Sequence, residues 1–188
     1  MKKEVSPRDS WIMLGPGQKI YVDEKIAKSW QEQRKALREI RGNVLALSIE
    51  IELILDQILI ALFFPKDITN ENLISIRKLF DNFLLKERPM SFNSKILLFR
   101  KLKEHYLLKD ENLTNLLSNL EKIKDTRNRF AHNTLAFVVE GESPEQKLTP
   151  KLTCYDKDII LNNDYFDELN GVYKFTRESI ENLVKKLS

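Results

Sequence analysis

The sequence predicts an all-α protein, a helical bundle of about five helices with a small β-hairpin inserted before the last helix. The 188 residues include only 5 glycines and 6 prolines, so turns are few. That is about half of the usual share of these two residues. Apolar residues recur at intervals of three and four along most of the chain, which is the period of an α-helix. A β-prone pattern replaces this period only between about residues 135 and 161.

Composition and charge exclude several classes of protein. Lys and Arg number 31 and Asp and Glu 28, and a net charge of +3 is too balanced to indicate nucleic-acid binding by itself. Collagen-like, disordered and disulfide-stabilised chains have other compositions. The single cysteine, Cys154, cannot close an intrachain disulfide and offers no metal cluster. We therefore expect a cytoplasmic protein with no metal and no other cofactor.

The chain is expected to divide into an irregular N-terminal segment, residues 1–22, and a helical domain, residues 23–188. Proline and glycine interrupt any regular pattern in the first segment, most densely over residues 15–17. Asp23 is expected to cap a long first helix, and Pro65 to end it.

The most apolar stretch of the chain, residues 44–64, is long enough to span a bilayer. It carries Glu50, Glu52 and Asp56, each of which would cost several kcal/mol near the centre of a membrane. We therefore interpret the stretch as a core helix and expect no membrane association. Glu50 borders the core face of this helix, whereas Glu52 and Asp56 are expected to point outward.

Three further helices are expected before the β-prone region. The apolar spacing predicts one near residues 70–85, capped by Asn70, and one near residues 92–106, capped by Ser91. A fourth helix is predicted near residues 111–134.

A hairpin and a last helix follow the fourth helix. The two strands of the hairpin are predicted at residues 135–140 and 151–161, with a turn-rich loop at residues 141–150 between them. The last helix is expected to start near Asn163 or Asp164 and to reach the end of the chain.

On the fourth helix, one arginine falls on the apolar face. On a helical wheel Arg127 lies within about 20° of Leu116, in the centre of the stripe that Leu120 and Ile123 continue. Arginine is seldom buried without a partner or a function. Arg127 is therefore expected either to pair with a carboxylate in the bundle or to serve a functional site.

His132 and Asn128 belong to the same stretch. They are four residues apart and share a helix face, whereas Arg127 and His132 diverge by about 140° and about 7.5 Å along a straight helix. Arg127 and His132 could serve one substrate if the helix loosens near His132, or if two copies face each other across a two-fold axis. Such a cleft would suit a phosphodiester, because Arg binds phosphate in a fork and His transfers protons near neutral pH.

Residues 127–132, Arg-Asn-Arg-Phe-Ala-His, resemble the Arg-x(4–6)-His motif of the HEPN superfamily. The similarity extends over roughly residues 35–187 and includes Ser48-Ile49-Glu50 in the first helix and residues 91–96 in the middle of the chain. It implies a helical bundle that dimerises with the two motifs facing one another. It also implies cleavage of RNA to a 2′,3′-cyclic phosphate without a metal, and roles such as toxin or phage-defence protein.

One departure from the family concerns control by an antitoxin. Some HEPN toxins carry a modified tyrosine two residues after the histidine, where this chain has Thr134. Control by an adenylylating antitoxin is therefore not expected, although another antitoxin or regulatory protein remains a candidate partner.

Other residues are candidates for supporting roles. Lys124 and Arg129 are expected to line the mouth of the cleft and attract the RNA backbone, or to be ordinary solvated helix charges. Glu50 could pair with Arg127 or orient His132, or simply face water. A second Arg-x(4)-His pair, Arg100 and His105, is expected to lie on a solvated surface and serves as an internal control.

Three hypotheses follow from the sequence. The leading one is a homodimeric, metal-independent endoribonuclease in which Arg127 binds the scissile phosphate, His132 is the general acid or base and Asn128 orients one of them. The second is a catalytically inactive HEPN-like module that binds RNA, a nucleotide or a protein partner. The third is a structural bundle in which Arg127 is a buried salt-bridge residue.

Overall fold

The computed structural model describes residues 10–15, 18–22, 24–64, 68–87, 90–105, 111–140, 147–154 and 157–187. These residues divide between two compact units, Met1–Gly42 and Asn43–Ser188. The division falls inside helix α1 (Glu24–Phe63) and not at residue 23, where the sequence had suggested it. The expected cap of this helix, Asp23, lies outside the described residues.

The first unit contains a β-hairpin followed by the first part of α1. Strands β1 (Ser10–Gly15) and β2 (Gln18–Val22) pair in antiparallel fashion, with Trp11 opposite Tyr21. The prediction that residues 1–22 are irregular was therefore wrong for these two strands. The glycines and proline of residues 15–17 separate two strands that have mixed apolar and polar residues, which is what a hairpin requires.

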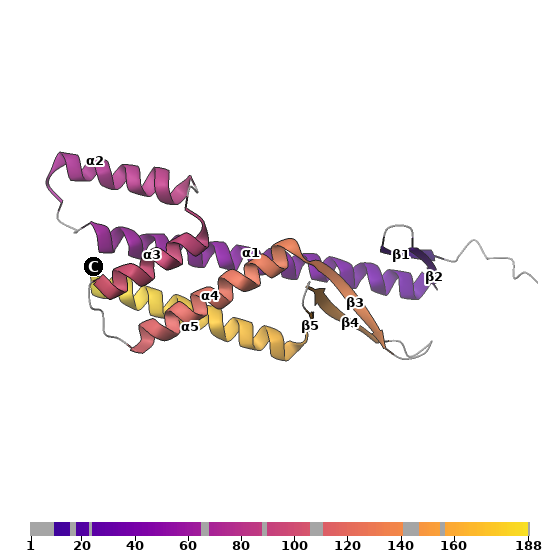
Figure 1. The fold of residues 1–188 in the computed structure, drawn as a ribbon. Helices are drawn as coiled ribbons and strands as arrows, with labels where there is room; N and C mark the ends of the chain where they lie inside the picture. Colours follow the sequence, from indigo (N-terminus) through magenta and orange to yellow (C-terminus); the bar gives the residue numbers. More distant parts are fainter. Residues whose placement is uncertain are drawn as a thin grey trace, which may run out of the picture. The chain divides into compact units, whose positions relative to one another are not determined.

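The second unit is the helical bundle that the sequence predicts (Figure 1). After α1, its helices are α2 (Glu71–Leu79), the π-helix η1 (Phe80–Lys86), α3 (Phe92–His105), α4 (Glu111–His132) and α5 (Asn163–Leu187). Helix α4 packs against both α3 and α5. The all-α fold with a small sheet before the last helix is thereby confirmed.

The two predicted N-terminal caps are present in this unit. The side-chain oxygen of Asn70 accepts hydrogen bonds from the backbone N–H groups of Asn72 and Leu73, and so begins α2. The hydroxyl of Ser91 accepts one from the backbone N–H of Ser94, at the start of α3. Both side chains satisfy donors that have no partner within the helix.

A three-stranded antiparallel sheet lies between α4 and α5 in the sequence. Its strands are β3 (Thr134–Glu140), β4 (Lys147–Thr153) and β5 (Asp158–Ile160), in the order β3-β4-β5. The predicted hairpin is confirmed in outline, but residues 147–150 belong to a strand and not to the loop. Thr134 pairs with Thr153, so the sheet begins two residues after the end of α4.

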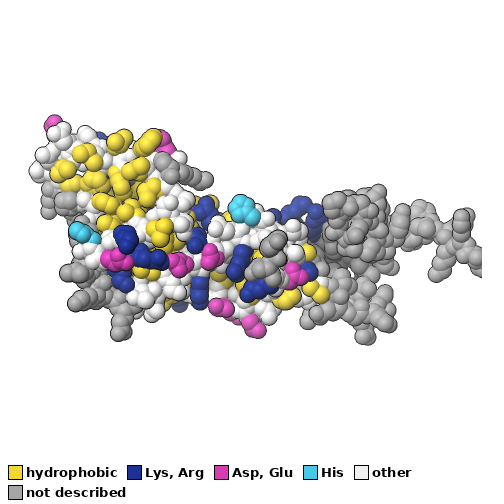
Figure 2. All heavy atoms as spheres, in the orientation of Figure 1, with side chains coloured by type: hydrophobic (Ala, Val, Ile, Leu, Met, Phe, Trp, Pro, Cys, Tyr) yellow, Lys and Arg dark blue, Asp and Glu magenta, His cyan; other side chains and the backbone are white. Residues whose placement is uncertain are grey.

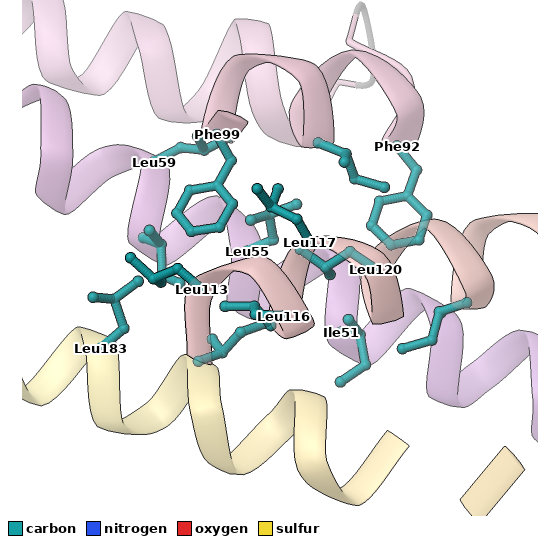
Figure 3. Close-up of a cluster of buried hydrophobic side chains, with 14 of the residues drawn as sticks. Ile51, Leu55, Leu59, Phe92, Phe99, Leu113, Leu116, Leu117, Leu120 and Leu183 are labelled. Atoms are coloured by element: carbon teal, nitrogen blue, oxygen red, sulfur yellow. The ribbon is translucent and has the colours of Figure 1, made fainter. Parts of the chain in front are cut away.

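The core of the bundle is formed by leucine, isoleucine and phenylalanine side chains from α1, α3, α4 and α5 (Figure 3). Leu59 of α1 lies beside Phe99 of α3, and Ile51, farther along the core, lies beside Leu120 of α4. The apolar second half of α1 is thus a core helix, as expected. No helix in the described part of the chain is long and apolar enough to cross a membrane.

A buried polar link joins α1 to α5. The hydroxyl groups of Ser48 and Tyr173 lie 2.6 Å apart, and the Ser48 hydroxyl also donates to the backbone carbonyl of Val44 at 2.7 Å. Both side chains are buried, so the hydrogen bonds fix how α5 lies along α1. Burial raises the pKa of Tyr173, which keeps its hydroxyl a neutral donor.

Helix α2 contributes no buried residue to the core. Figure 2 shows hydrophobic side chains gathered over this helix. The exposed apolar residues of α2 and η1 are Leu73, Ile76, Leu79 and Phe83. At the start of η1, the Phe80 ring lies 5.0 Å from that of Phe63 and 5.6 Å from that of Phe64.

Candidate functional site

Arg127 lies at the edge of the core and not at its centre. Its side chain is 28% exposed, whereas Ile123 and Phe130 on the same helix are fully buried. The core face of α4 turns toward α5 in its last turns, because Phe130 packs against Tyr165. The prediction of a central position for Arg127 was therefore wrong: the residue lies at the edge of the apolar stripe, and part of its side chain is open to solvent.

A carboxylate of α1 holds the other side of this guanidinium. Nη1 of Arg127 donates to Oε2 of Glu52 at 2.9 Å. The guanidinium carbon also lies 5.9 Å from the centre of the Phe92 ring, at the start of α3. Arg127 is thus fixed from α1 and bordered by α3.

Glu52 is shared between two cations. Its second oxygen, Oε1, lies 3.0 Å from Nζ of Lys95 on α3. Nζ of Lys95 lies 2.9 Å from both carboxylate oxygens of Asp56, one turn after Glu52, and donates to the backbone carbonyl of Leu85 at 3.3 Å. The four side chains form a chain of alternating charge that runs from the core to the surface. We call Arg127, Glu52, Lys95 and Asp56 the ionic chain.

The inner end of the ionic chain is buried. The Lys95 side chain is only 2% exposed, and Asp56 is buried as well. Burial raises the pKa of Asp56 from 3.8 to about 6, and the opposing effect of the Lys95 charge is smaller. Asp56 is therefore ionised at pH 7, which is only about one unit above its pKa.

The carboxylates of α1 are arranged differently from the prediction. Glu50 pairs with Arg177 of α5 at 3.0 Å, on an exposed surface, so it neither holds Arg127 nor orients His132. Glu52 and Asp56, expected to point outward, lie instead against α3. On a helical wheel they lie about 60° and about 100° from Leu55, which places both on the flank that α3 covers.

His132 is the last residue of α4, and its side chain is exposed. The helix does not loosen before it, because the backbone N–H of Asn133 still bonds to the carbonyl of Arg129 at 3.0 Å. Asn128, one turn before His132, is exposed as well. Arg127 and His132 therefore diverge along one straight helix, by the angle that the sequence implies.

The two other cations of α4 that the sequence singled out lie on different sides. Lys124 shares the Arg127 side, since its Nζ lies 3.4 Å from Oδ1 of Asn93 at the start of α3, and it also pairs with Asp125 at 3.2 Å. Arg129 lies instead near Tyr165 of α5. Burial raises the pKa of Tyr165, and the positive charge of Arg129 opposes part of this increase. The structure thus brings Lys124 and Arg127 together and separates Arg129 from them.

The second Arg-x(4)-His pair has the surface position that was expected. Arg100 forms an ion pair with Glu121 of α4 at the surface, where both side chains are partly exposed. His105 is exposed at the end of α3. In the described part of the chain, the ion pair of Arg100 does not lead on to a buried lysine, whereas that of Arg127 does.

The sequence predicted neither the contacts of Glu52 and Asp56, which were expected to point outward, nor the burial of Lys95. A signal for Lys95 was available, because on the wheel of α3 it falls within the arc of Phe92, Phe99 and Leu102. Glu52 and Asp56 are four residues apart and share a helix side. Within the described ranges, no three His, Cys, Asp or Glu side chains are grouped so that they could hold a metal ion.

The arrangement offers an accessible guanidinium, a nearby ammonium and an exposed imidazole on one helix. Such a surface can bind an anion and supply or accept a proton close to it. Comparisons of the chain with protein-family models, with curated proteins and with solved structures find no match.

Proposed function

We propose that the protein is a metal-independent endoribonuclease of HEPN type that acts in the cytoplasm. The observation that carries the proposal is the state of Arg127. One nitrogen of its guanidinium is held by Glu52, while the side chain remains 28% exposed. A guanidinium has five N–H donors, so the solvent side retains donors for the oxygens of a phosphate.

In the proposed reaction, each residue has a defined task. Arg127 binds the scissile phosphate and stabilises the added negative charge of the pentacoordinate transition state. His132 moves the proton of the ribose 2′-hydroxyl or that of the leaving 5′-oxygen. The 2′-hydroxyl oxygen attacks phosphorus, the bond to the 5′-oxygen breaks, and a 2′,3′-cyclic phosphate forms. Asn128 orients the imidazole from the preceding turn, and Lys124 attracts the RNA backbone.

The proposed site is shared between two copies of the chain. Because α4 stays helical through His132, Arg127 and His132 of one copy point in different directions. Exposed apolar residues that could bury a contact lie beside the site, since Ile49 and Leu53 flank Glu52 on α1. A two-fold contact beside Arg127 is therefore what the proposal requires, so that the arginine of one copy can act together with the histidine of the other.

The test is cleavage of single-stranded RNA in excess EDTA, with H132A compared with H105A. Both variants remove an exposed histidine at the end of a helix, so they differ only in the site that they affect. We expect wild type and H105A to cleave and H132A to lose activity by about 10²-fold or more, the usual contribution of a general acid or base. DNA of the same sequence should remain intact because it lacks the 2′-hydroxyl.

Other outcomes would favour the other hypotheses. RNA binding without cleavage, weakened by R127M, would indicate an inactive module that binds RNA. If RNA is neither bound nor cleaved, the Glu52–Arg127 ion pair would have only a structural role. Cleavage that survives in H132A would contradict the proposal. An antitoxin or other regulatory protein remains part of the proposal, and it would be expected to cover Arg127 and His132.

A further inference from the structure

Among the carboxylates that the structure describes, Glu52 is distinguished by joining a buried cation to a partly exposed one. Oε1 faces Lys95, which is 2% exposed, and Oε2 faces Arg127, which is 28% exposed. Lys95 cannot move toward solvent without leaving Asp56 and the carbonyl of Leu85, which hold it at 2.9 and 3.3 Å. Arg127 has no such restraint on its solvent side.

This arrangement determines what happens when Arg127 turns toward an external phosphate. A carboxylate that loses its single cation in a half-buried position is left with an uncompensated charge, which is costly. Glu52 avoids this cost because Lys95 stays beside Oε1 when Arg127 leaves Oε2. The strength with which Glu52 retains Arg127 therefore depends on how much of the Lys95 charge it receives.

Asp56 determines that share. Its carboxylate lies as close to Nζ of Lys95 as that of Glu52 does, so the two carboxylates divide one positive charge. If the negative charge of Asp56 is removed, Lys95 interacts more strongly with Glu52, and the ion pair between Glu52 and Arg127 becomes weaker. If the charges of Lys95 and Asp56 are both removed, Arg127 is the one cation of the ionic chain that remains beside Glu52, and their ion pair becomes stronger.

We propose that Lys95 and Asp56 are positioning residues for Arg127, which set how readily it passes from Glu52 to a phosphate oxygen of the substrate. The proposal builds on the proposed function in taking RNA phosphate as the ligand. The hold of Glu52 on Arg127 is a property of the free protein and can be measured without RNA.

The first test is the rate at which the Arg127 guanidinium rotates about its Nε–Cζ bond, measured by NMR at pH 7.5 without ligand. We expect rotation to be faster than in wild type in D56N and slower in D56N/K95M, each by about threefold, which is the size of change expected for a weak ion pair screened by solvent. K101M/E104Q is the matched control, because it removes one positive and one negative charge from an exposed pair on the same helix. Its rate should equal that of wild type.

The second test is binding of a single-stranded oligonucleotide with 2′-deoxyribose, which carries the phosphates but cannot be cleaved by 2′-hydroxyl attack. We expect D56N to bind it about threefold more tightly than wild type, and D56N/K95M about threefold more weakly. Damage to the fold would weaken binding in both variants, so shifts in opposite directions distinguish positioning from a structural role.

The outcomes separate this inference from the function on which it builds. Rotation rates that do not change, or that change in the same direction in both variants, overturn the inference even if RNA is cleaved. If D56N/K95M fails to fold, D56N alone decides, and an unchanged rotation rate in D56N overturns the inference. If wild type neither binds the oligonucleotide nor cleaves RNA, the proposed function is wrong, while the rotation rates still decide whether Lys95 and Asp56 position Arg127.

Discussion

Lys95 brings a positive charge into the core of the bundle, where Glu52 and Asp56 lie within 3.0 Å of it. A buried charge of this kind is tolerated only when it is paired and hydrogen-bonded, and the carbonyl of Leu85 supplies a further acceptor. Each member of the ionic chain therefore depends on its neighbours, so that a substitution at one residue changes the environment of the others.

Asp56 should give the stability of the protein a distinct dependence on pH. Burial raises the pKa of Asp56 from 3.8 to about 6, so between these values the folded protein holds a proton that the unfolded chain has released. This contribution to stability is fully present below about pH 4 and is lost as the pH rises through about 6. Asn cannot titrate, so in D56N this contribution is absent.

The measurement is urea unfolding of wild type and D56N from pH 4 to pH 7. The free energy of unfolding of wild type, minus that of D56N, should fall over this range by about 3 kcal/mol, as two pKa units imply. A difference that stays constant or rises with pH would contradict the placement of Asp56 in the core.

The geometry of Arg127 predicts that a positive charge at this position is not by itself sufficient for RNA cleavage. Lysine would keep the positive charge but lose the planar fork that can bind Glu52 and a phosphate together. We expect R127K to lower kcat/KM for RNA cleavage by about tenfold or more, whereas R100K leaves it within about twofold of wild type. Equal effects of the two substitutions would indicate that general charge, and not the site, is responsible.

At the scale of the elements, most of the helices could be predicted because their apolar residues follow the helical period. Asn70 and Ser91 begin α2 and α3 as their side chains predict. The first hairpin could not be recognised in the same way, because the glycines and proline near its strands were interpreted as signs of an irregular segment. Local patterns thus defined helices more reliably than short strands.

The candidate site was predictable only in part. Asn128, His132 and Lys124 lie on α4 as the helical spacing predicts, whereas Arg127 lies at the edge of the core and not at its centre. The partner of Arg127 was not predictable, because the choice between Glu50 and Glu52 depends on which flank of α1 is covered by α3 and which by α5. That choice is made by packing between helices, about which a single sequence gives no direct information.

Helix α2 should depend on its cap more than α3 does. It has no buried residue, so the hydrogen bonds of the Asn70 side chain contribute a large share of the stability of its first turn. N70A should cost about 1 kcal/mol, expressed as faster hydrogen exchange of the α2 amides with little change in global unfolding. S91A removes the cap of a helix that packs into the core, so it should lower the global stability instead. Equal global losses would contradict this difference.

At the scale of the whole molecule, the proposed function requires two copies. Leu53 is 53% exposed and follows Glu52, so it should lie within the two-fold contact. We expect sedimentation at micromolar concentration to show a dimer, and L53K to shift the protein toward the monomer and to lower RNA cleavage in parallel. L79K, which places the same charge on the exposed face of α2, should remain dimeric. A monomeric wild type would argue strongly against a shared site.

The π-helix η1 constrains the number of residues in this segment as well as their identity. Its wider turn, seen in the bond from the backbone N–H of Glu87 to the carbonyl of Asn82 at 3.1 Å, holds one more residue than an α-helical turn would. Within this turn lies Leu85, whose carbonyl faces Lys95. Deleting a single residue between 80 and 86 would rotate that carbonyl away by about 100°. Insertions and deletions here would therefore disturb Lys95 even when every side chain of the ionic chain is retained.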